Sequence, residues 1–404
     1  MAQKVLLLYS GGLDTSVMIR WIKENLGYDV VTLTLDVGQD SNDLDAIAQK
    51  AVKIGAVDTI TKDVKEEFVR NYAFKDVKAD GLYQGTYPLS TAVARPLMAS
   101  VAVEVAHDTG CSIIAHGCTG KGNDQVRFDL AIRSLDSTLK VIAPVRDWNM
   151  NRDQEAEYAR KHGIPVKNGG KYSTDENLWG RSVEGSDLED PSMPVPEDAY
   201  LWVTPPSKVD GTFETVTLGF TSGIPVSLNG EHMDPVQLVK KLNGIAGSRG
   251  VGAIDHLEDR VTGIKSREFY ECPAAVTVLT AHRALEKLVL TRKELELKHY
   301  IDNIWSNMVY EGFWFDPLMA HINAFEESVN TPVSGKVTLK LGKGMCIVSG
   351  VESQNSLYNY GLTTYSSVQT FDQTQAPGFI SIYGLQSVLA SSVRSVMKEA
   401  EITQ

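Results

Sequence analysis

Apolar residues follow two patterns along the first half of the chain, short continuous runs and a repeat of three or four positions. Residues 4–9, 30–35 and 112–115 are short apolar runs, the pattern of strands buried on both faces of a parallel sheet. Between them, apolar residues recur every three or four positions, as on one face of a helix, and the clearest example runs over residues 14–25. Strands that alternate with helices in this way predict a doubly wound α/β domain, whose ligands bind at the carboxyl ends of the strands.

The first strand ends in Ser10-Gly11-Gly12, and helical spacing begins at about Asp14. Two glycines let the backbone turn sharply and approach a ligand closely. Unpaired N–H groups and the positive end of the helix dipole make a helix N-terminus a site for anions. The spacing is neither that of a Walker A motif nor that of a dinucleotide-binding motif. We interpret the segment as another kind of phosphate loop; an ordinary tight turn is the alternative.

A second polar loop, HGCTGKGNDQVRF (residues 116–128), directly follows the strand at 112–115. Asn123 and Asp124 can bind an ammonium or ureido group, and Arg127 can bind a carboxylate through two parallel hydrogen bonds. A plain surface turn is the alternative, but such a turn does not need these three side chains so close together. The loop is therefore a candidate binding site for an amino acid.

The pattern changes near residue 170, where we place a domain boundary. Residues 213–220 and 224–228 alternate with period two and predict an antiparallel pair of strands. The polar segments within 172–184 have little periodicity and predict surface loops or short helical turns. The stretch 250–273 is rich in charges and glycines, and its pattern alone favours a solvated loop. Together these segments indicate a second domain of the α+β class.

In the last third of the chain, the pattern over residues 280–326 predicts mainly helices. The pattern over residues 336–350 predicts a hairpin. After residue 378 comes an apolar helical stripe, which must be buried against its own domain or against a neighbouring subunit. The stripe consists of Ile382, Leu385, Val388, Leu389, Val393, Val396 and Met397. We expect three parts: a doubly wound nucleotide-binding domain (1–170), an α+β domain (171–378) and a C-terminal helix (379–404).

Composition narrows the class of protein. A chain of 404 residues is long for one core, and a content of 43% hydrophobic and 22% charged residues is typical of a globular protein. The net charge of −12 argues against a nucleic-acid partner, whose backbone attracts basic surfaces. No apolar run is long enough for a membrane span. The four cysteines are scattered, which suits reduced thiols in the cytoplasm better than disulfides or a zinc site.

Five segments together resemble the argininosuccinate synthase family. SGGLDTS alone is similar to the loop of the wider ATP pyrophosphatase superfamily, and four further segments make the resemblance specific. The five segments are SGGLDTS (10–16), LYxxxYxxxTAxARP (82–96), GCTGKGNDQVRF (117–128), SxDENL (173–178) and IDxxEDRxxGIKSR (254–267). With this resemblance, the stretch at 250–273 becomes part of a site instead of a solvated loop.

The resemblance implies a ligase of arginine biosynthesis that forms a carbon–nitrogen bond. Citrulline, aspartate and ATP would give argininosuccinate, AMP and pyrophosphate through a citrullyl-adenylate. Magnesium is expected on the phosphates, held largely by ATP itself, with no metal site of the protein's own. The family also implies a homotetramer, in which the C-terminal helix reaches a neighbouring subunit.

The resemblance also implies site residues, carried over by motif. ATP would be bound by Leu8, Tyr9, Ser10, Gly11, Gly12, Leu13, Asp14, Thr15, Ser16, Leu35 and Gly117. Aspartate would be bound by Thr119, Asn123 and Asp124. Citrulline would be bound by Tyr87, Asn123, Arg127, Ser173, Ser182, Glu258 and Tyr270. Asp124 is the catalytic candidate, because it can orient the attacking amine.

Three positions depart from the family pattern. Ala92 stands where the family has a serine that contacts citrulline, Asp259 replaces an asparagine, and Glu268 replaces a glycine. These departures concern the amino-acid sites and leave the ATP loop intact. The nearest rival interpretation is another ligase of the pyrophosphatase superfamily or a tRNA-modifying thiolase. The acidic composition and the lack of a C-x-x-C motif disfavour the thiolase. A rival of another class is a non-catalytic nucleotide or amino-acid sensor that kept the fold.

Overall fold

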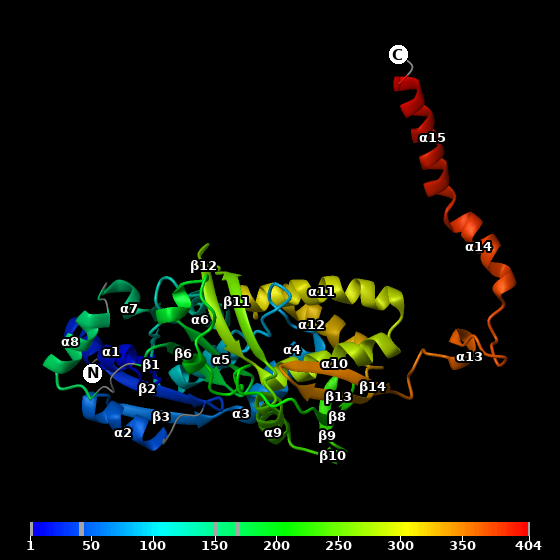
Figure 1. Cartoon of the computed structure of the whole chain (residues 1–404). Helices are drawn as coiled ribbons and strands as arrows, with labels where there is room; N and C mark the ends of the chain where they lie inside the picture. Colours follow the sequence, from blue (N-terminus) through cyan, green and yellow to red (C-terminus); the bar gives the residue numbers. More distant parts are fainter. Residues whose placement is uncertain (1–2, 40–43, 149, 151, 166–169, 403–404) are drawn as a thin grey trace. The chain divides into compact units, whose positions relative to one another are not determined.

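The computed structural model describes residues 3–39, 44–148, 150, 152–165 and 170–402. The chain forms two compact units, Met1–Asn355 and Ser356–Gln404. Figure 1 shows the elements of both, coloured along the sequence. The boundary expected near residue 170 falls beside residues 166–169, which lie outside the described part.

The first sheet is parallel throughout, as the apolar runs predict. Its strands are β1 (Lys4–Leu8), β2 (Asp29–Asp36), β3 (Asp58–Asp63), β4 (Ile113–Ala115) and β5 (Lys140–Ile142). The spatial order is β3-β2-β1-β4-β5. The chain moves outward from β1 to β3 and then crosses to the other side of β1. Ligands bind at such a reversal, at the carboxyl ends of the strands, which here lies between β1 and β4.

Helices cover both faces of this sheet (Figure 1). They are α1 (Leu13–Leu26), α2 (Leu44–Ile54), α3 (Lys65–Phe68), α4 (Phe74–Lys78), α5 (Ala94–Thr109), α6 (Asp124–Leu135), α7 (Pro144–Asp147) and α8 (Arg152–Lys161). A π-helical turn, Val69–Ala73, joins α3 to α4. Successive residues of a strand face opposite sides. Val5 and Leu7 therefore pack with α1 and α8, whereas Leu6 and Leu8 pack with α5 and α6. The predicted doubly wound α/β class is confirmed.

A four-stranded antiparallel sheet replaces the surface loops expected within 172–184 and the solvated loop that pattern alone favoured at 250–273, a stretch that the family resemblance instead assigns to the site. The expected surface loops within 172–184 are the strands β6 (Ser173–Asn177) and β7 (Gly180–Glu184), and the stretch at 250–273 is a hairpin of β11 (Ala253–Asp259) and β12 (Lys265–Glu271). The spatial order is β11-β12-β7-β6. The apolar alternation of a strand is weak because several of these side chains line a cavity. The charges of the hairpin are paired across its strands: Arg267 holds Asp255 through two bonds of 2.7 Å.

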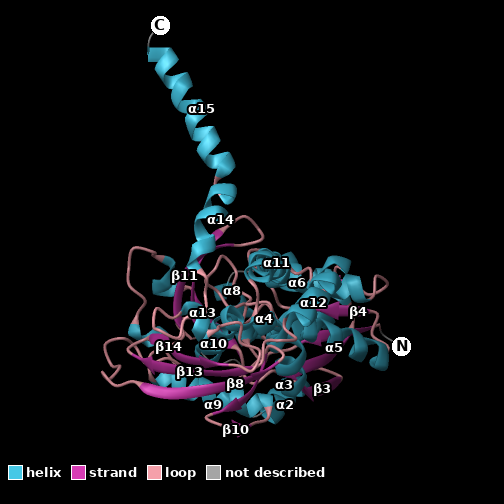
Figure 2. Ribbon diagram, turned by 90° about the vertical axis from the view of Figure 1, so that its right-hand side faces the viewer, coloured by secondary structure: helices cyan, strands magenta, loops and turns pink. Residues whose placement is uncertain are grey.

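A third sheet agrees with the predicted pairings. Its antiparallel strands are β8 (Glu214–Thr221), β9 (Ile224–Leu228), β10 (Glu231–His232), β13 (Gly335–Gly342) and β14 (Met345–Glu352), in the order β10-β9-β8-β13-β14. Figure 2 shows β8, β13 and β14 side by side. The helices α9 (Pro235–Ser248) and α10 (Pro273–Val289) pack against it, and the next two helices, α11 (Arg292–Glu311) and α12 (Pro317–Val329), pack against each other. Two short 3-10 helices, Ser186–Glu189 and Glu197–Ala199, lie in the connection before β8.

A buried group of charges lies between α10, α11 and α12. The ammonium of Lys298 lies 2.7 Å from Asp302 and 3.1 Å from Glu286. It also lies 3.3 Å from Glu326 and 4.0 Å from Asp80. The imidazole of His282 lies 2.9 Å from Asp80, and the carboxylates around it raise its pKa. Basic groups alone do not balance four carboxylates in a desolvated place. Protons make up part of the difference: burial raises the pKa of Glu286 to about 8 and that of Glu326 to about 7.

The C-terminal unit contains α13 (Tyr360–Thr363), a 3-10 turn (Gln373–Gln375), α14 (Ala376–Tyr383) and α15 (Leu385–Ile402). The predicted stripe is helical, and its members from Ile382 to Val393 are exposed. The side chains of residues 396–402, and all of residues 403–404, lie outside the described part. Among the described residues, no helix is both long and apolar enough to cross a membrane.

Candidate active site

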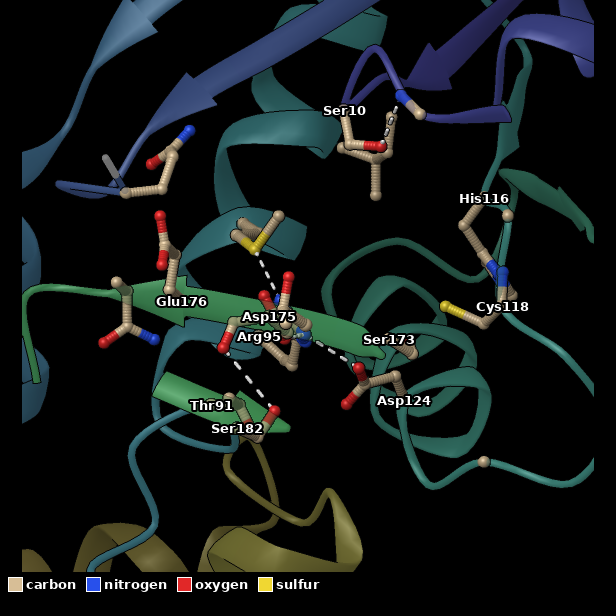
Figure 3. Close-up of a pocket in the computed structure, with 18 of the residues that line it drawn as sticks. Ser10, Thr91, Arg95, His116, Cys118, Asp124, Ser173, Asp175, Glu176 and Ser182 are labelled. Carbon is tan, nitrogen blue, oxygen red and sulfur yellow. Dashed lines mark hydrogen bonds and ion pairs between the residues drawn. The ribbon is translucent and has the colours of Figure 1, made fainter. Parts of the chain in front are cut away.

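A cavity of about 850 Å³ opens at the carboxyl ends of β1, β2 and β4. This volume is within the range of small-molecule sites. The loops after β1 and β4 line it from the first sheet, and β6, β7, β11 and β12 line it from the second. Figure 3 shows part of this lining, with Ser10 of the first loop opposite Ser173 of β6 and Ser182 of β7. Of the residues expected in the site, Gly11 and Ser16 do not line the cavity. The others do: Leu8, Tyr9, Ser10, Gly12, Leu13, Asp14, Thr15, Leu35, Tyr87, Gly117, Thr119, Asn123, Asp124, Arg127, Ser173, Ser182, Glu258 and Tyr270.

The phosphate loop has the geometry of an anion site. Gly11 has a φ of 77°, which favours glycine, and Gly12 is the N-cap of α1. A glycine has no side chain to cap the first-turn N–H groups, so these can reach a ligand. The hydroxyls of Ser10 and Thr15 lie 3.3 Å apart beside them. A Cβ on Gly117 would lie 2.9 Å from the Thr15 methyl, so only glycine lets the two loops come this close.

Two arginines and two carboxylates meet in the cavity, and Figure 3 shows three of them, Arg95, Asp124 and Asp175. Arg95 of α5 lies 2.7 Å from Asp124 and also bonds Asp175 of β6. Arg127 lies 2.9 Å from the second oxygen of Asp124. Burial alone would raise the pKa of Asp124, but the two guanidiniums outweigh it and hold that pKa well below its usual range. Asp124 therefore stays ionised and can bind an ammonium group.

One nitrogen of the Arg127 guanidinium, Nη2, has no hydrogen-bond partner among the described residues. The Nε of Arg127 donates to the Tyr310 carbonyl at 2.8 Å, and its Nη1 bonds Asp124. Its Nη2 is buried and has no hydrogen-bond partner within the described part of the chain. A buried donor without a partner costs free energy, so this nitrogen is suited to an anionic ligand group.

Tyr310 of α11 connects the side chain of Glu258 on β11 to that of Asn123, the N-cap of α6. Its hydroxyl donates to Glu258 at 2.6 Å and accepts from the Asn123 amide at 2.8 Å. The Asn123 oxygen accepts from the Val261 N–H at 2.9 Å, which fixes the orientation of the amide. Tyr270 donates to the other oxygen of Glu258 at 2.6 Å. Glu258 is thus held by two hydroxyls at the wall of the cavity.

Family models match almost the whole chain: the arginosuccinate synthase N-terminal HUP domain matches residues 4–165, and the arginosuccinate synthase C-terminal domain matches residues 172–390. The argininosuccinate synthase of Picrophilus torridus is 54% identical over 395 residues, covering 98% of this chain and 99% of that protein. That of Pyrococcus furiosus is 53% identical over 387 residues, covering 96% and 94%. That of Thermoplasma volcanium is 51% identical over 401 residues, covering 99% and 100%.

This chain belongs to the argininosuccinate synthase family. The resemblance drawn from the five segments is confirmed. The chain is accordingly an enzyme of the ligase class, with ATP as a substrate.

Sequence reasoning about the family site left out Arg95, Asp175 and Tyr310. Arg95 and Asp175 stand inside quoted motifs, so a signal was present, but the motifs do not say that the two side chains meet. Tyr310 stands in an ordinary helical stretch, and nothing in its neighbourhood points to the cavity. Its role depends on the packing of α11 against α6 and β11.

The three departures from the family pattern occupy different environments. Ala92 is buried and does not line the cavity, whereas its neighbour Thr91 does, with its hydroxyl 2.8 Å from that of Tyr87. Asp259 faces solvent and bonds Lys265 at 2.5 Å. Glu268 lines the cavity 2.7 Å from Arg260, and burial, with a contribution from Glu184, raises its pKa to about 8. Glu268 is the departure that places an additional titratable group in the cavity wall.

Proposed function

We propose that this cavity joins citrulline to aspartate at the expense of ATP, the reaction of its family. The ureido oxygen of citrulline attacks the α-phosphorus of ATP, pyrophosphate leaves, and the amine of aspartate then displaces AMP from the citrullyl-adenylate. A urea carbon is a poor electrophile, and adenylation gives it a good leaving group. The protein contributes mainly positioning and charge stabilisation. The observation that carries the proposal is the convergence of the phosphate loop, Asp124, Arg127 and Glu258 on one cavity.

The ligands divide the cavity by charge. The phosphates of ATP take the N-terminal end of α1, and Gly117 allows the second loop to approach them. The ammonium of the substrate aspartate binds the carboxylate of Asp124, beside Thr119 and Asn123. The carboxylate of citrulline accepts a hydrogen bond from Nη2 of Arg127, and the ammonium of citrulline binds the carboxylate of Glu258. The remaining residues carried over from the family line the cavity around these ligands: Leu8, Tyr9, Ser10, Gly12, Leu13, Asp14, Thr15 and Leu35 for ATP, and Tyr87, Ser173, Ser182 and Tyr270 for citrulline.

Gly11 and Ser16 support the loop from behind. The Gly11 carbonyl accepts from Lys50 at 2.6 Å, and the Ser16 hydroxyl lies 3.2 Å from that of Tyr9. Their part in ATP binding is through the backbone shape of the loop.

Magnesium arrives with the nucleotide. The Asp14 carboxylate and the Ser10 and Thr15 hydroxyls line the cavity, and oxygen donors of this kind suit the cation. When bound, magnesium neutralises charge on the phosphates.

The parts of the chain take separate tasks in this proposal. Residues 1–170 bind ATP and aspartate and share the binding of citrulline with residues 171–378, which also contribute to assembly. Residues 379–404 join subunits in a homotetramer. The exposed apolar stripe of α14 and α15 supports the last point, because such a surface needs a partner. The cysteines of the described part are free thiols, which fits the cytoplasm. No nucleic acid or membrane takes part.

A product assay tests the proposed function. The protein is incubated with ATP, magnesium, citrulline and aspartate, leaving out one component at a time. AMP and pyrophosphate should form only when citrulline is present, and labelled pyrophosphate should exchange into ATP with citrulline alone. ADP and inorganic phosphate as primary products would refute the proposal.

A further inference from the structure

The second half of the proposed reaction needs a proton acceptor. The α-amine of aspartate is protonated near neutral pH, and an ammonium has no electron pair with which to attack carbon. Some group next to it must remove one proton. The inference below rests on the proposed function and adds a catalytic residue to it.

Asp124 is poorly suited to accept this proton. Both of its oxygens face guanidinium groups, Arg95 at 2.7 Å and Arg127 at 2.9 Å. These cations stabilise the ionised carboxylate, so its basicity is low. Asp124 can therefore bind the ammonium group, but its carboxylate is too weak a base to remove a proton from it readily.

Asp175 is the other carboxylate at this place. It bonds the same Arg95 nitrogen that holds Asp124, and 40% of its side chain is exposed, as a lining residue of the cavity. Figure 3 shows Asp175 next to Arg95, with Asp124 on the far side of the guanidinium. Although partly exposed to the cavity, Asp175 is surrounded by protein, and this desolvation together with the charge of Asp124 raises its pKa despite Arg95.

Asp175 also lies next to the proposed citrulline residues. Ser173 is two residues earlier on β6, so it shares a face with Asp175. Ser182 is directly opposite Asp175 in the register of β6 and β7, and its hydroxyl donates to the Asp175 carbonyl at 3.5 Å. The Asp175 carboxylate therefore lies between Asp124 of α6, which is proposed to bind the substrate aspartate, and the two serines of β6 and β7 that are proposed to bind citrulline.

We propose that Asp175 is the general base of the second half-reaction and that Asp124 only orients the amine. Asp175 takes one proton from the α-ammonium, and the freed electron pair forms the bond to the ureido carbon. The bond between that carbon and the phosphate oxygen breaks, and its electron pair leaves with AMP. The nitrogen loses its second proton to the departing phosphate, which completes the guanidinium. Asp175 then returns its proton to water. Two neighbouring carboxylates thus have different roles because their surroundings differ.

The test uses the full-length variant Asp175→Asn, with Asp187→Asn as the matched control. Asp187 is a solvent-exposed carboxylate whose partner, Lys171, also bonds Asp198. Pyrophosphate exchange with citrulline alone reports the first half-reaction, and argininosuccinate formation reports both. Hydroxylamine, an amine that is largely unprotonated at neutral pH, can trap the adenylate without a base.

We expect Asp175→Asn to keep pyrophosphate exchange and hydroxylamine trapping at nearly wild-type rates. Argininosuccinate formation should fall at least ~100-fold, the usual contribution of a general base, and should recover partly at high pH, where free amine accumulates. Asp187→Asn should behave as the wild type. The titratable groups that face Asp175 are Arg95 of α5, Cys118 before α6, and Asp124 and Arg127 of α6. None of them is changed in the variant.

Two results would overturn the inference. Argininosuccinate formation at the wild-type rate would show that another group, such as the phosphate of the adenylate, takes the proton. An equal loss of exchange and ligation would show that Asp175 only positions Arg95. Absence of exchange in the wild type would refute the proposed function itself, which keeps the two failures distinct.

Discussion

Removal of one hydroxyl, in Tyr310→Phe, tests whether α11 builds the amino-acid end of the cavity. The substitution keeps the ring, which stacks on Tyr83 with centroids 3.4 Å apart and lies 4.8 Å from the Arg127 guanidinium. It also keeps the main-chain carbonyl that accepts from Arg127. Only the bonds to Glu258 and Asn123, of 2.6 and 2.8 Å, are lost. The change is therefore confined to the side chains proposed to bind amino acids.

The size of the effect follows from these bonds. A hydrogen bond to a charged group contributes about 1.5–3 kcal/mol, and each 1.4 kcal/mol is about a factor of ten in affinity. Loss of the donor to Glu258 should raise the KM for citrulline roughly 10- to 100-fold. The Asn123 amide also loses an acceptor, so the KM for aspartate should rise as well. The KM for ATP should change little, because Tyr310 has no bond to the phosphate loop in the described structure.

Steady-state rates with each substrate varied in turn measure these changes, and calorimetry measures citrulline binding directly. The control is Tyr300→Phe, which removes a hydroxyl from an exposed tyrosine of the same helix and should leave all three KM values unchanged. An equal rise in the KM for ATP and for citrulline would show that the hydroxyl supports the fold as a whole. An unchanged KM for citrulline would refute the role given to Glu258.

Three further changes have defined outcomes. Arg127→Ala should weaken citrulline binding by about one to two decades, measured by calorimetry, and leave ATP binding nearly intact; equal losses would place the second loop at the wrong substrate. Because burial raises the pKa of Glu286 from 4.5 to about 8 and that of Glu326 to about 7, the folded protein keeps protons that the unfolded chain releases. The free energy of unfolding should therefore fall as pH rises from about 4.5 to about 8 and level off above that. The variant Glu286→Gln should show a weaker dependence of the free energy of unfolding on pH, measured by urea titration at several pH values. An unchanged pH dependence would contradict the raised pKa of Glu286. Removal of residues 379–404 should lower the mass found by light scattering; a truncated protein that stays tetrameric would place the interface elsewhere.

Local signals in the sequence determined the nucleotide half of this protein. The strand, the glycine turn and the helix start around Ser10-Gly11-Gly12 are encoded within a few neighbouring residues, because the anion site uses backbone groups of one continuous segment. The buried parallel strands were also readable, since strands covered on both faces are apolar throughout. The order of five motifs along the chain was enough to identify the family.

Only the tertiary structure decided the amino-acid half. The strands β6 and β7 were not recognised because side chains that line a cavity are polar, which removes the apolar alternation of a strand. Arg95 meets Asp175 across 80 residues of sequence, and Tyr310 meets Asn123 across 187. Such contacts depend on how separate elements pack, which periodicity along the chain does not record. Asp124 and Asp175 are the same residue type in the sequence, and the number of guanidinium groups around each gives them different chemistry.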